Sequence, residues 1–310
     1  MSDTGFRFVL KKLFEMLASL VVLATLTFFL LKALPGGPFD EDTALNPVVK
    51  EKLSEHWGVQ QSALGQVGSY LLAVGQGDLG ISMAKPDRTV AEIIAQGVRN
   101  TLALNGIALL CILSGAFIVA VAAVRFRETW IETMVDQMVI AFLSLPSLFW
   151  GPLLIYLFGF YWNLLPVAFL ASPIHYVLPV LTLSLRPLAF LIRLLKNSLN
   201  ENFQMDYVRT AKAKGIGVWA ILIRHVLKNS LVPFLSYVGP LIVSLLSGSF
   251  LVEVLFAVPG LGTEFISALN DRDYTLIVGL TLFYGSLLIV VNSLIDVLLR
   301  LADPRLKEQA

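Results

Sequence analysis

Residues 100–124 read NTLALNGIALLCILSGAFIVAVAAV, and none of these 25 positions carries a charged side chain. About 20 apolar residues in a helix are enough to cross the roughly 30 Å hydrocarbon core of a bilayer. The segment is therefore predicted to be a transmembrane helix. Further runs without a charged residue occupy residues 16–31, 138–162, 163–185, 229–252 and 274–295. Together they predict an all-α membrane protein with six transmembrane helices.

The fourth of these helices, centred near residue 186, is the least regular. Pro179 and Pro187 interrupt its pattern. It also contains Arg186 and Arg193, and an arginine at the centre of a membrane helix costs about 2.5–3.5 kcal/mol on an insertion scale. Arg193 fits a long side chain whose charged end reaches the cytoplasmic surface. Arg186 is expected either to do the same or to face the helix bundle or a cavity.

The composition agrees with a membrane protein and offers no recognisable catalytic site. Hydrophobic residues make up 56% of the chain and charged residues 15%, and the mean hydropathy is +0.77, whereas a soluble domain has about 25% charged residues. The net charge of +1 gives no field that would attract nucleic acid. The single cysteine excludes an intrachain disulfide, and the scattered histidines form no metal-binding pattern, so no metal or cofactor is predicted.

Neither of two common nucleotide-binding motifs is supported by the sequence. Residues 75–80 match G-x-G-x-x-G, but they stand in a long loop without the βαβ unit that a dinucleotide site needs, which favours a turn-rich outside loop. The chain contains no G-x-x-x-x-G-K-[ST], so it has no ATP-binding P-loop of its own.

Lys and Arg are unevenly divided between the two sides of the predicted membrane. If the N-terminus is inside, 15 of the 23 Lys and Arg residues fall on the side of both termini and 6 fall on the other. Cytoplasmic loops carry an excess of these residues, so both termini are predicted to be cytoplasmic. The first apolar run is long for a secretory leader and lacks an A-x-A cleavage pattern, which favours a retained first helix.

The most informative segment follows the fourth helix and reads Asp206-Tyr207-Val208-Arg209-Thr210-Ala211-Lys212-Ala213-Lys214-Gly215. Asp206 suits an N-cap, and Gly215 suits the left-handed residue that ends a helix. The helix between them has about eight residues, which is too short to be stable alone in water. It is therefore expected to lie against another surface.

The faces of this short helix differ in character. Tyr207, Val208 and Ala211 fall on one face, whereas Arg209 and Lys212 fall on another. A second amphipathic helix at the headgroup level is predicted after the glycine. Its apolar residues are Trp219, Leu222, Ile223, Val226 and Leu227, and its polar residues are Arg224, His225 and Lys228. The loop is either a basic segment that only sets topology or a docking helix for a cytoplasmic partner, which its small residues favour.

These residues resemble the permease subunits of bacterial ABC importers for peptides and nickel, most closely the first permease of oligopeptide systems. Residues 206–215 and 224–233 are similar to the coupling loop of that family. Arg209-Thr210-Ala211 stands where the general importer motif has E-A-A, and Gly215 is in register with its glycine. Further matches follow in order at residues 35–39 (PGGPF), 77–80 (GDLG), 100–102 (NTL), 144–147 (SLPS), 259–262 (PGLG), 272–274 (RDY) and 303–305 (DPR).

The resemblance implies a type I ABC importer permease fold in the cell inner membrane. Such a permease pairs with a second permease subunit, binds two cytoplasmic ATP-binding subunits that hydrolyse ATP, and receives oligopeptides from a periplasmic substrate-binding protein. Residues 206–215 would form the ATPase-coupling segment, with the fifth helix linking it to the translocation path. Arg186 and Glu253 are the candidate path residues, and Glu253 is either a gate contact or a plain interfacial carboxylate.

The expected organisation follows from the resemblance. Residues 1–34 form the N-terminal transmembrane helix, and residues 35–99 form a periplasmic loop. Residues 100–302 form a permease core of five transmembrane helices with a cytoplasmic coupling loop at about 198–230, and residues 303–310 form a cytoplasmic tail.

Two alternatives remain open at this point. One is a permease of the same family for dipeptides, nickel or another small solute. The other is an ATP-independent secondary transporter, which would need paired acids inside the membrane and an inverted repeat. The sequence shows no repeat and only Asp136 and Asp296 near helix ends, which disfavours the secondary transporter.

Overall fold

The computed structural model describes residues 3–33 and 63–302 of the chain. Within these residues the only paired extended backbone is one isolated β-bridge between Ile81 and Thr89, and the rest of the regular structure is helical. The chain divides into two compact units, with residues 1–100 and 259–310 in unit 1 and residues 101–258 in unit 2. The PGGPF and DPR motifs of the sequence lie outside the described residues.

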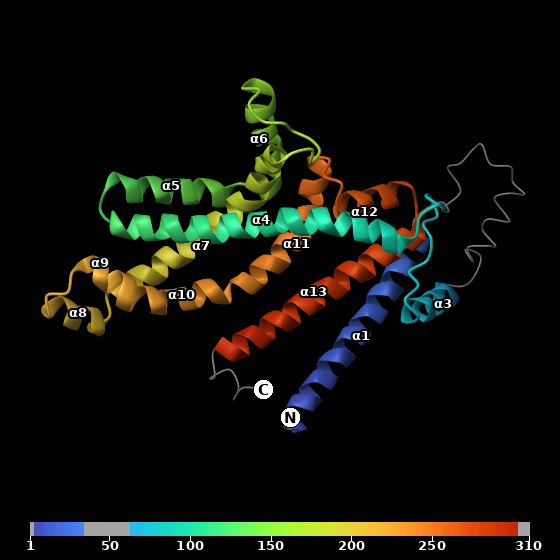
Figure 1. Cartoon of the computed structure of the whole chain (residues 1–310), viewed down its shortest axis with the longest axis horizontal. Helices are drawn as coiled ribbons and strands as arrows, with labels where there is room; N and C mark the ends of the chain where they lie inside the picture. Colours follow the sequence, from blue (N-terminus) through green and yellow to red (C-terminus); the bar gives the residue numbers. More distant parts are fainter. Residues whose placement is uncertain (1–2, 34–62, 303–310) are drawn as a thin grey trace, which may run out of the picture. The chain divides into compact units, whose positions relative to one another are not determined.

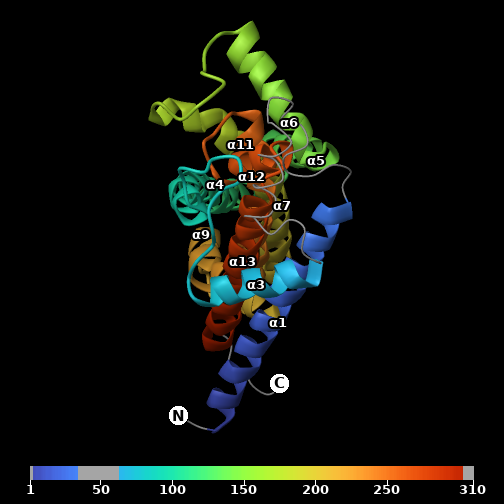
Figure 2. The same ribbon diagram turned by 90° about the vertical axis from the view of Figure 1, so that its right-hand side faces the viewer.

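Unit 1 is built around two long antiparallel helices. Its elements are α1 (Asp3–Ala33), α3 (Ala63–Gly75), the start of α4 (Val90–Arg125), α12 (Leu261–Asn270) and α13 (Tyr274–Ala302). The Tyr274 hydroxyl donates to the Leu31 carbonyl oxygen at 3.4 Å, while Gly285 lets the side chain of Leu23 approach closely. Figures 1 and 2 both show α1 beside α13. The start of α1 and the end of α13 therefore point to the same side, as cytoplasmic termini would require.

Two helices of unit 1 were not predicted from the sequence. Residues 63–75 lie in the predicted outside loop but form the helix α3, and α12 adds to the six predicted helices. Both are short, and short helices depend on packing more than on propensity. Phe28 of α1 meets Tyr70 of α3 edge to face, with ring centroids 5.7 Å apart, and α12 packs on α13.

Unit 2 is organised around one central helix, α7. Its elements are the rest of α4, α5 (Trp130–Ser144), α6 (Ser147–Leu154), η1 (Ile155–Tyr161), η2 (Pro173–Tyr176), α7 (Val177–Phe203), α8 (Asp206–Ala213), α9 (Val218–Ile221), η3 (Leu222–Val226), α10 (Leu227–Ser236) and α11 (Val238–Leu255). Helix α7 packs against α5, α6, α10 and α11. Leu191, Leu195 and Leu199, spaced four apart on one face, are fully buried in this core.

Five helical stretches are long and apolar enough to cross a membrane, or six if a bent pair counts as one span. The five are Phe14–Leu31, Val90–Arg125, Pro173–Phe203, Val218–Leu255 and Tyr274–Ile295. They correspond to the first, second, fourth, fifth and sixth helices expected from the sequence.

The third expected helix is not one straight element. α5 ends at Ser144, a new helical segment begins at Ser147, and the two are bent by 102° (Figure 1). Leu145 has φ −95° and ψ 142° because the residue before a proline is pushed away from the helical region, and Pro146 follows it. The SLPS motif, placed inside a helix by the sequence analysis, is therefore a break between two helices.

The fourth expected helix is more regular than its prolines suggested. α7 runs without interruption from Val177 to Phe203. Pro179 lies in the first turn, where a missing N–H leaves no intrahelical bond unmade. Pro187 lies inside the helix, and the tight packing of α7 on its neighbours holds the helix together there.

Candidate functional site

With Asp206 as N-cap, the short helix was predicted to begin at Tyr207, but α8 begins one residue earlier, at Asp206. Met205 is the N-cap, with extended backbone at φ −68° and ψ 151°, and its carbonyl accepts from the Val208 amide at 3.0 Å. The assignment of Asp206 as N-cap is therefore wrong, because Asp206 is already the first helical residue. Its carboxylate still lies in the first turn, where a negative charge interacts favourably with the helix dipole.

The other end of α8 is closed as the sequence predicts. Gly215 has φ +77°, and its amide donates to the Lys212 carbonyl oxygen at 2.9 Å. The amide of Ile216 donates to the Ala211 carbonyl oxygen at 3.2 Å. These two bonds form a Schellman motif, which confirms Gly215 as the left-handed residue after the helix.

One face of α8 is anchored in unit 2. Val208 and Ala211 are buried in the core, as expected. Tyr207, which was predicted on the same face, is 38% exposed and does not enter the core. Its hydroxyl instead donates to Asn202 Oδ1 at 3.0 Å and accepts from Asn229 Nδ2 at 3.4 Å. The phenol thus ties α8 to the end of α7 and the start of α10.

The opposite face of α8 is exposed and basic. Its exposed residues include Arg209, Thr210, Lys212, Ala213 and Lys214. Arg209 lies 3.5 Å from Asp206, but their side chains are 78% and 94% exposed, so this ion pair contributes little. Within the described residues, Lys212 takes part in no ion pair. The basic groups on this face are therefore free to meet a partner.

The second amphipathic segment is only partly as predicted. Leu222 and Val226 are buried, together with Ile221. Trp219 and Ile223, expected on the same face, are 50% and 49% exposed. The cause is the π-helical turn η3, which adds a residue per turn and rotates the apolar face. α9 packs on α8, and Trp219 adds exposed apolar surface to this region.

A charge cluster missed by the sequence analysis joins α5 to α7. Lys196 Nζ lies 2.7 Å from Asp136 Oδ1 and 2.9 Å from Glu132 Oε1, and the lysine side chain is 9% exposed. Glu132 also accepts from the Glu128 amide at 2.8 Å, at the start of α5. The available signal was the i, i+4 spacing of the two acids, which puts both carboxylates on one helix face and calls for a cation.

This cluster bears on the secondary-transporter alternative. Asp136, one of the two acids noted in the sequence, has Lys196 as a structural partner and is not an isolated acid inside the membrane. The side chain of Asp296, the other acid, lies outside the described residues.

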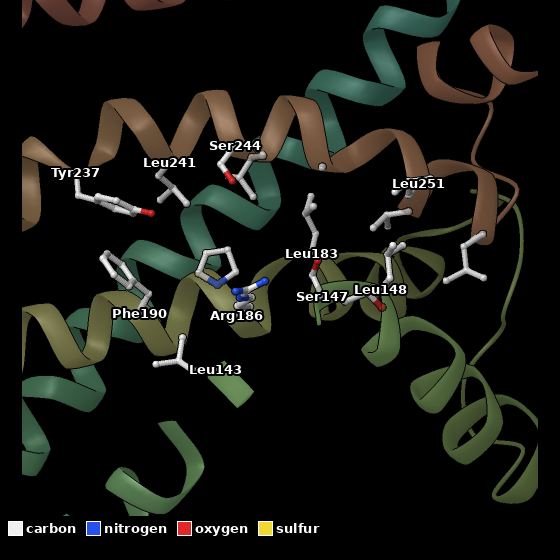
Figure 3. A pocket seen from close by; sticks show the side chains of 16 residues that line it. Leu143, Ser147, Leu148, Leu183, Arg186, Phe190, Tyr237, Leu241, Ser244 and Leu251 are labelled. Carbon is white, nitrogen blue, oxygen red and sulfur yellow. The ribbon is translucent and has the colours of Figure 1, made fainter. Parts of the chain in front are cut away.

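A cavity of about 410 Å³ lies between α6, α7 and α11 in unit 2. Arg186 is on its wall, and Figure 3 shows the guanidinium between Phe190 and Tyr237 on one side and Ser147 on the other. The rings of Phe190 and Tyr237 have centroids 4.6 Å apart. Thr182 and Ser244 add hydroxyl groups to a lining that is otherwise largely apolar.

The structure separates Arg186 from the other candidate residues. Arg186 is the one charged residue among the described residues that line the cavity, and no described carboxylate pairs with it. Arg186 and Arg193 are both exposed, but Arg193 does not line the cavity. Glu253 is fully buried on α11 and does not line the cavity either. Of the two candidate path residues, the structure therefore brings Arg186 and not Glu253 to this cavity.

Two motifs that are far apart in the sequence meet in unit 1. Asp273 is fully buried, and its Oδ1 accepts from the Leu276 amide at 2.9 Å, which caps α13. Its Oδ2 accepts from the Ser82 hydroxyl and from the Ala84 amide, the latter at 3.1 Å. The loop after the GDLG motif is therefore fastened to the RDY motif. We refer to Ser82, Ala84, Asp273 and Leu276 as the outer knot.

The segment matching G-x-G-x-x-G is a turn. Gly75 ends α3, Gly77 and Gly80 have positive φ, and Asp78 Oδ1 accepts from the Gly80 amide at 2.8 Å. The Tyr70 hydroxyl donates to the Leu79 carbonyl oxygen. Burial, together with the nearby charges of Asp78 and Asp273, raises the pKa of this tyrosine. The turn-rich interpretation of these residues agrees with this geometry.

The membrane-length helices define a helical membrane protein, with a cavity between helices of unit 2. Residues 107–308 match the model of the protein family described as "binding-protein-dependent transport system inner membrane component". The chain belongs to this family and is an integral multi-pass membrane protein. The family resemblance drawn from the coupling segment is thereby confirmed.

Relatives of similar length match nearly the whole chain. The dipeptide transport system permease protein DppB of Bacillus subtilis is 35% identical over 302 residues, covering 97% of this chain and 98% of the relative. The oligopeptide transport system permease protein OppB of Salmonella typhimurium is 31% identical over 310 residues, covering 97% and 99%.

Solved structures show the same fold. A chain of the MetNI methionine ABC transporter aligns with a TM-score of 0.57 at 16% identity, covering 68% of this chain and 96% of that one. An amino acid ABC transporter aligns with a TM-score of 0.54 at 16% identity, covering 68% and 94%. The expected type I ABC importer permease fold is confirmed.

Proposed function

We propose that the chain is the transmembrane permease subunit of an ATP-driven importer that carries oligopeptides into the cytoplasm. The names of its relatives, which cover nearly the full chain, support a peptide substrate. The identity of 35% to a dipeptide permease favours dipeptides as a second candidate substrate. The chain is a transport subunit, and separate subunits hydrolyse ATP.

The observation that carries the proposal is the construction of α8. Its C-terminal end is closed at Gly215, one face is buried in unit 2, and the other presents exposed basic residues. A helix anchored in this way can transmit the movement of a bound partner to the rest of unit 2 without unfolding. We assign α8 and Gly215 as the segment that binds a cytoplasmic ATP-binding subunit.

The link from α8 to the cavity runs through α7. The sequence favoured the fifth helix for this role, but that stretch contains the π-helical turn η3 and changes from α10 to α11 at Tyr237. α7 is continuous over 27 residues and carries Arg186 on the cavity wall, and only two residues separate its end from the start of α8. Movement of α8 on ATP binding would thus reach the cavity through one unbroken helix.

The proposed assembly contains further subunits. A second permease subunit would complete the translocation path, two ATP-binding subunits would lie on the cytoplasmic face, and a periplasmic binding protein would deliver the peptide. The positive-inside rule supports cytoplasmic termini, and bacterial relatives support the inner membrane as the location.

Reconstitution tests the proposal directly. The permease is placed in proteoliposomes with its second permease and ATP-binding subunits, and the binding protein is added with trialanine, dialanine or Ni²⁺. We expect a peptide-loaded binding protein to stimulate ATP hydrolysis and peptide uptake, and Ni²⁺ to do neither. Stimulation by Ni²⁺ alone would contradict the peptide assignment.

A further inference from the structure

Among the described residues, the lining of the cavity in unit 2 carries positive charge and no negative charge. Arg186 supplies a permanent positive charge, and no carboxylate stands among the described residues that line the cavity. The remaining lining is apolar or carries neutral hydroxyls such as those of Ser147, Thr182 and Ser244. A guanidinium has five N–H donors and no acceptor, so this wall can donate several hydrogen bonds to an anion and offers no charge to a cation.

Keeping such a charge among membrane-length helices is costly. An arginine within a membrane helix is destabilising unless water, a cavity or an anion meets it, and residues of this kind mark binding sites and pathways. Lys196 lies ten residues further along the same helix, and its charge is balanced within the chain by two carboxylates. Arg186 is exposed in this chain and has no such described partner, so its side chain is open to a counter-charge from outside the chain.

We infer that Arg186 recognises a carboxylate of the transported peptide, in particular its C-terminal carboxylate. This inference rests on the proposed function and adds a specificity-determining contact to it. The planar guanidinium can hold a carboxylate with two parallel hydrogen bonds, which gives orientation as well as attraction. The peptide would pass with its carboxylate at Arg186 and its uncharged parts along the apolar wall.

The size and lining of the cavity agree with a small peptide. A volume of about 410 Å³ falls within the range of pockets for small molecules. Phe190 and Tyr237 form an aromatic wall that packs against side chains of different shapes without requiring particular polar groups. The cavity would thus read the charged end of a peptide and tolerate variety in its sequence.

The test compares trialanine with trialanine amide, which differ only in the C-terminal charge. Uptake of both peptides into proteoliposomes that contain the full importer is measured for the wild-type protein, Arg186→Met, Arg186→Lys and Arg193→Met. All use the same binding protein, so its own preference cancels when the acid-to-amide ratio is compared between variants. Arg193→Met is the matched control, because it removes an exposed arginine of α7 outside the cavity.

We expect Arg186→Met to lower the acid-to-amide uptake ratio about tenfold, the size of one charge-assisted hydrogen-bonded contact. Arg186→Lys should keep part of the preference, and Arg193→Met should keep all of it. An unchanged ratio in Arg186→Met would overturn the inference. If uptake of both peptides then fell equally, Arg186 would instead serve the fold or pair with the second permease subunit.

A second measurement does not depend on the amide. In a Cys111→Ser background, Arg186→Cys is treated with a thiol reagent that adds an ammonium group or with one that adds a neutral methyl group. We expect the cationic reagent alone to restore trialanine uptake severalfold. Equal restoration by both reagents, or by neither, would overturn the inference. Failure of the wild-type importer to take up any peptide would instead overturn the proposed function.

Discussion

The outer knot of unit 1 and the helix α8 of unit 2 use polar residues in opposite ways. In the outer knot, Asp273 and Ser82 are fully buried, and the carboxylate accepts three hydrogen bonds from the chain. In α8, Arg209 and Lys212 point outward and make no contact that would hold the fold. Polar groups that are satisfied within the chain support the structure, whereas those left exposed on an anchored helix are available to a partner. Substitutions in the two regions should therefore separate stability from function.

The largest loss of stability is expected for Asp273→Ala. The change leaves the Ser82 hydroxyl and two backbone amides without their acceptor in a buried place, which costs about 3 kcal/mol. Thermal unfolding of the purified protein in detergent measures the loss. Asp271→Ala, two residues away and exposed, is the matched control and should unfold close to the wild-type temperature. Equal stability of the two variants would show that the outer knot does not hold unit 1 together.

A smaller loss is expected for Lys196→Met. Two carboxylates would lose their cation, and because Glu132 and Asp136 are 20% and 48% exposed the cost should be about 2 kcal/mol, less than for a fully buried pair. Combining Lys196→Met with Glu132→Gln and Asp136→Asn should restore most of the stability, since no unpaired charge remains. Arg193→Met serves as the control on the same helix. A triple variant no more stable than Lys196→Met would contradict the role given to the charge cluster.

Gly215→Val should cost about 1–2 kcal/mol, because a β-branched residue resists φ +77°. No atom lies near the position of a new Cβ, so the cost comes from the backbone angle and not from a clash. The variant should remain in the membrane but retain less ATP-binding subunit on co-purification. Gly217→Val is the matched control, with equal space but no positive φ. Full retention of the ATP-binding subunit by Gly215→Val would speak against α8 as its docking element.

The smallest change in stability is expected for the double variant Arg209→Ala/Lys212→Ala. Both side chains are exposed, and such surface changes alter stability by about 0.5 kcal/mol or less. The affinity for the ATP-binding subunit should nevertheless fall, which titration of that subunit into the reconstituted permease can measure. Unchanged affinity would place the docking surface elsewhere.

The sequence was sufficient where one physical signal dominated. Long uncharged runs placed five membrane-length helices, and Gly215 was recognised because few residues accept a positive φ. The prediction failed where packing decided between alternatives. The π-helical turn η3 rotated the face that carries Trp219, and Tyr207 found polar partners on α7 and α10 instead of the core. Such outcomes depend on neighbours that a single sequence does not place.

The candidate site was predicted to a similar degree. The bounds of the short helix α8, to within one residue, and the position of Arg186 on a membrane-length helix followed from the pattern of charges and glycines. The pairing of Lys196 with two acids of α5 did not, because it joins residues 60 positions apart. The position of Glu253 near the outer end of the fifth predicted helix made it a candidate for the path, but the structure buries it away from this cavity wall.

The most direct test of the account asks which face of α8 touches the ATP-binding subunit. In a Cys111→Ser background, single cysteines at Arg209 and Lys212 carry a photoreactive label, with labelled Asp271→Cys in unit 1 as the control. After illumination of the assembled importer, we predict crosslinks to the ATP-binding subunit from positions 209 and 212 and none from position 271. Absence of crosslinks from both α8 positions, with the subunit still bound, would contradict the central claim.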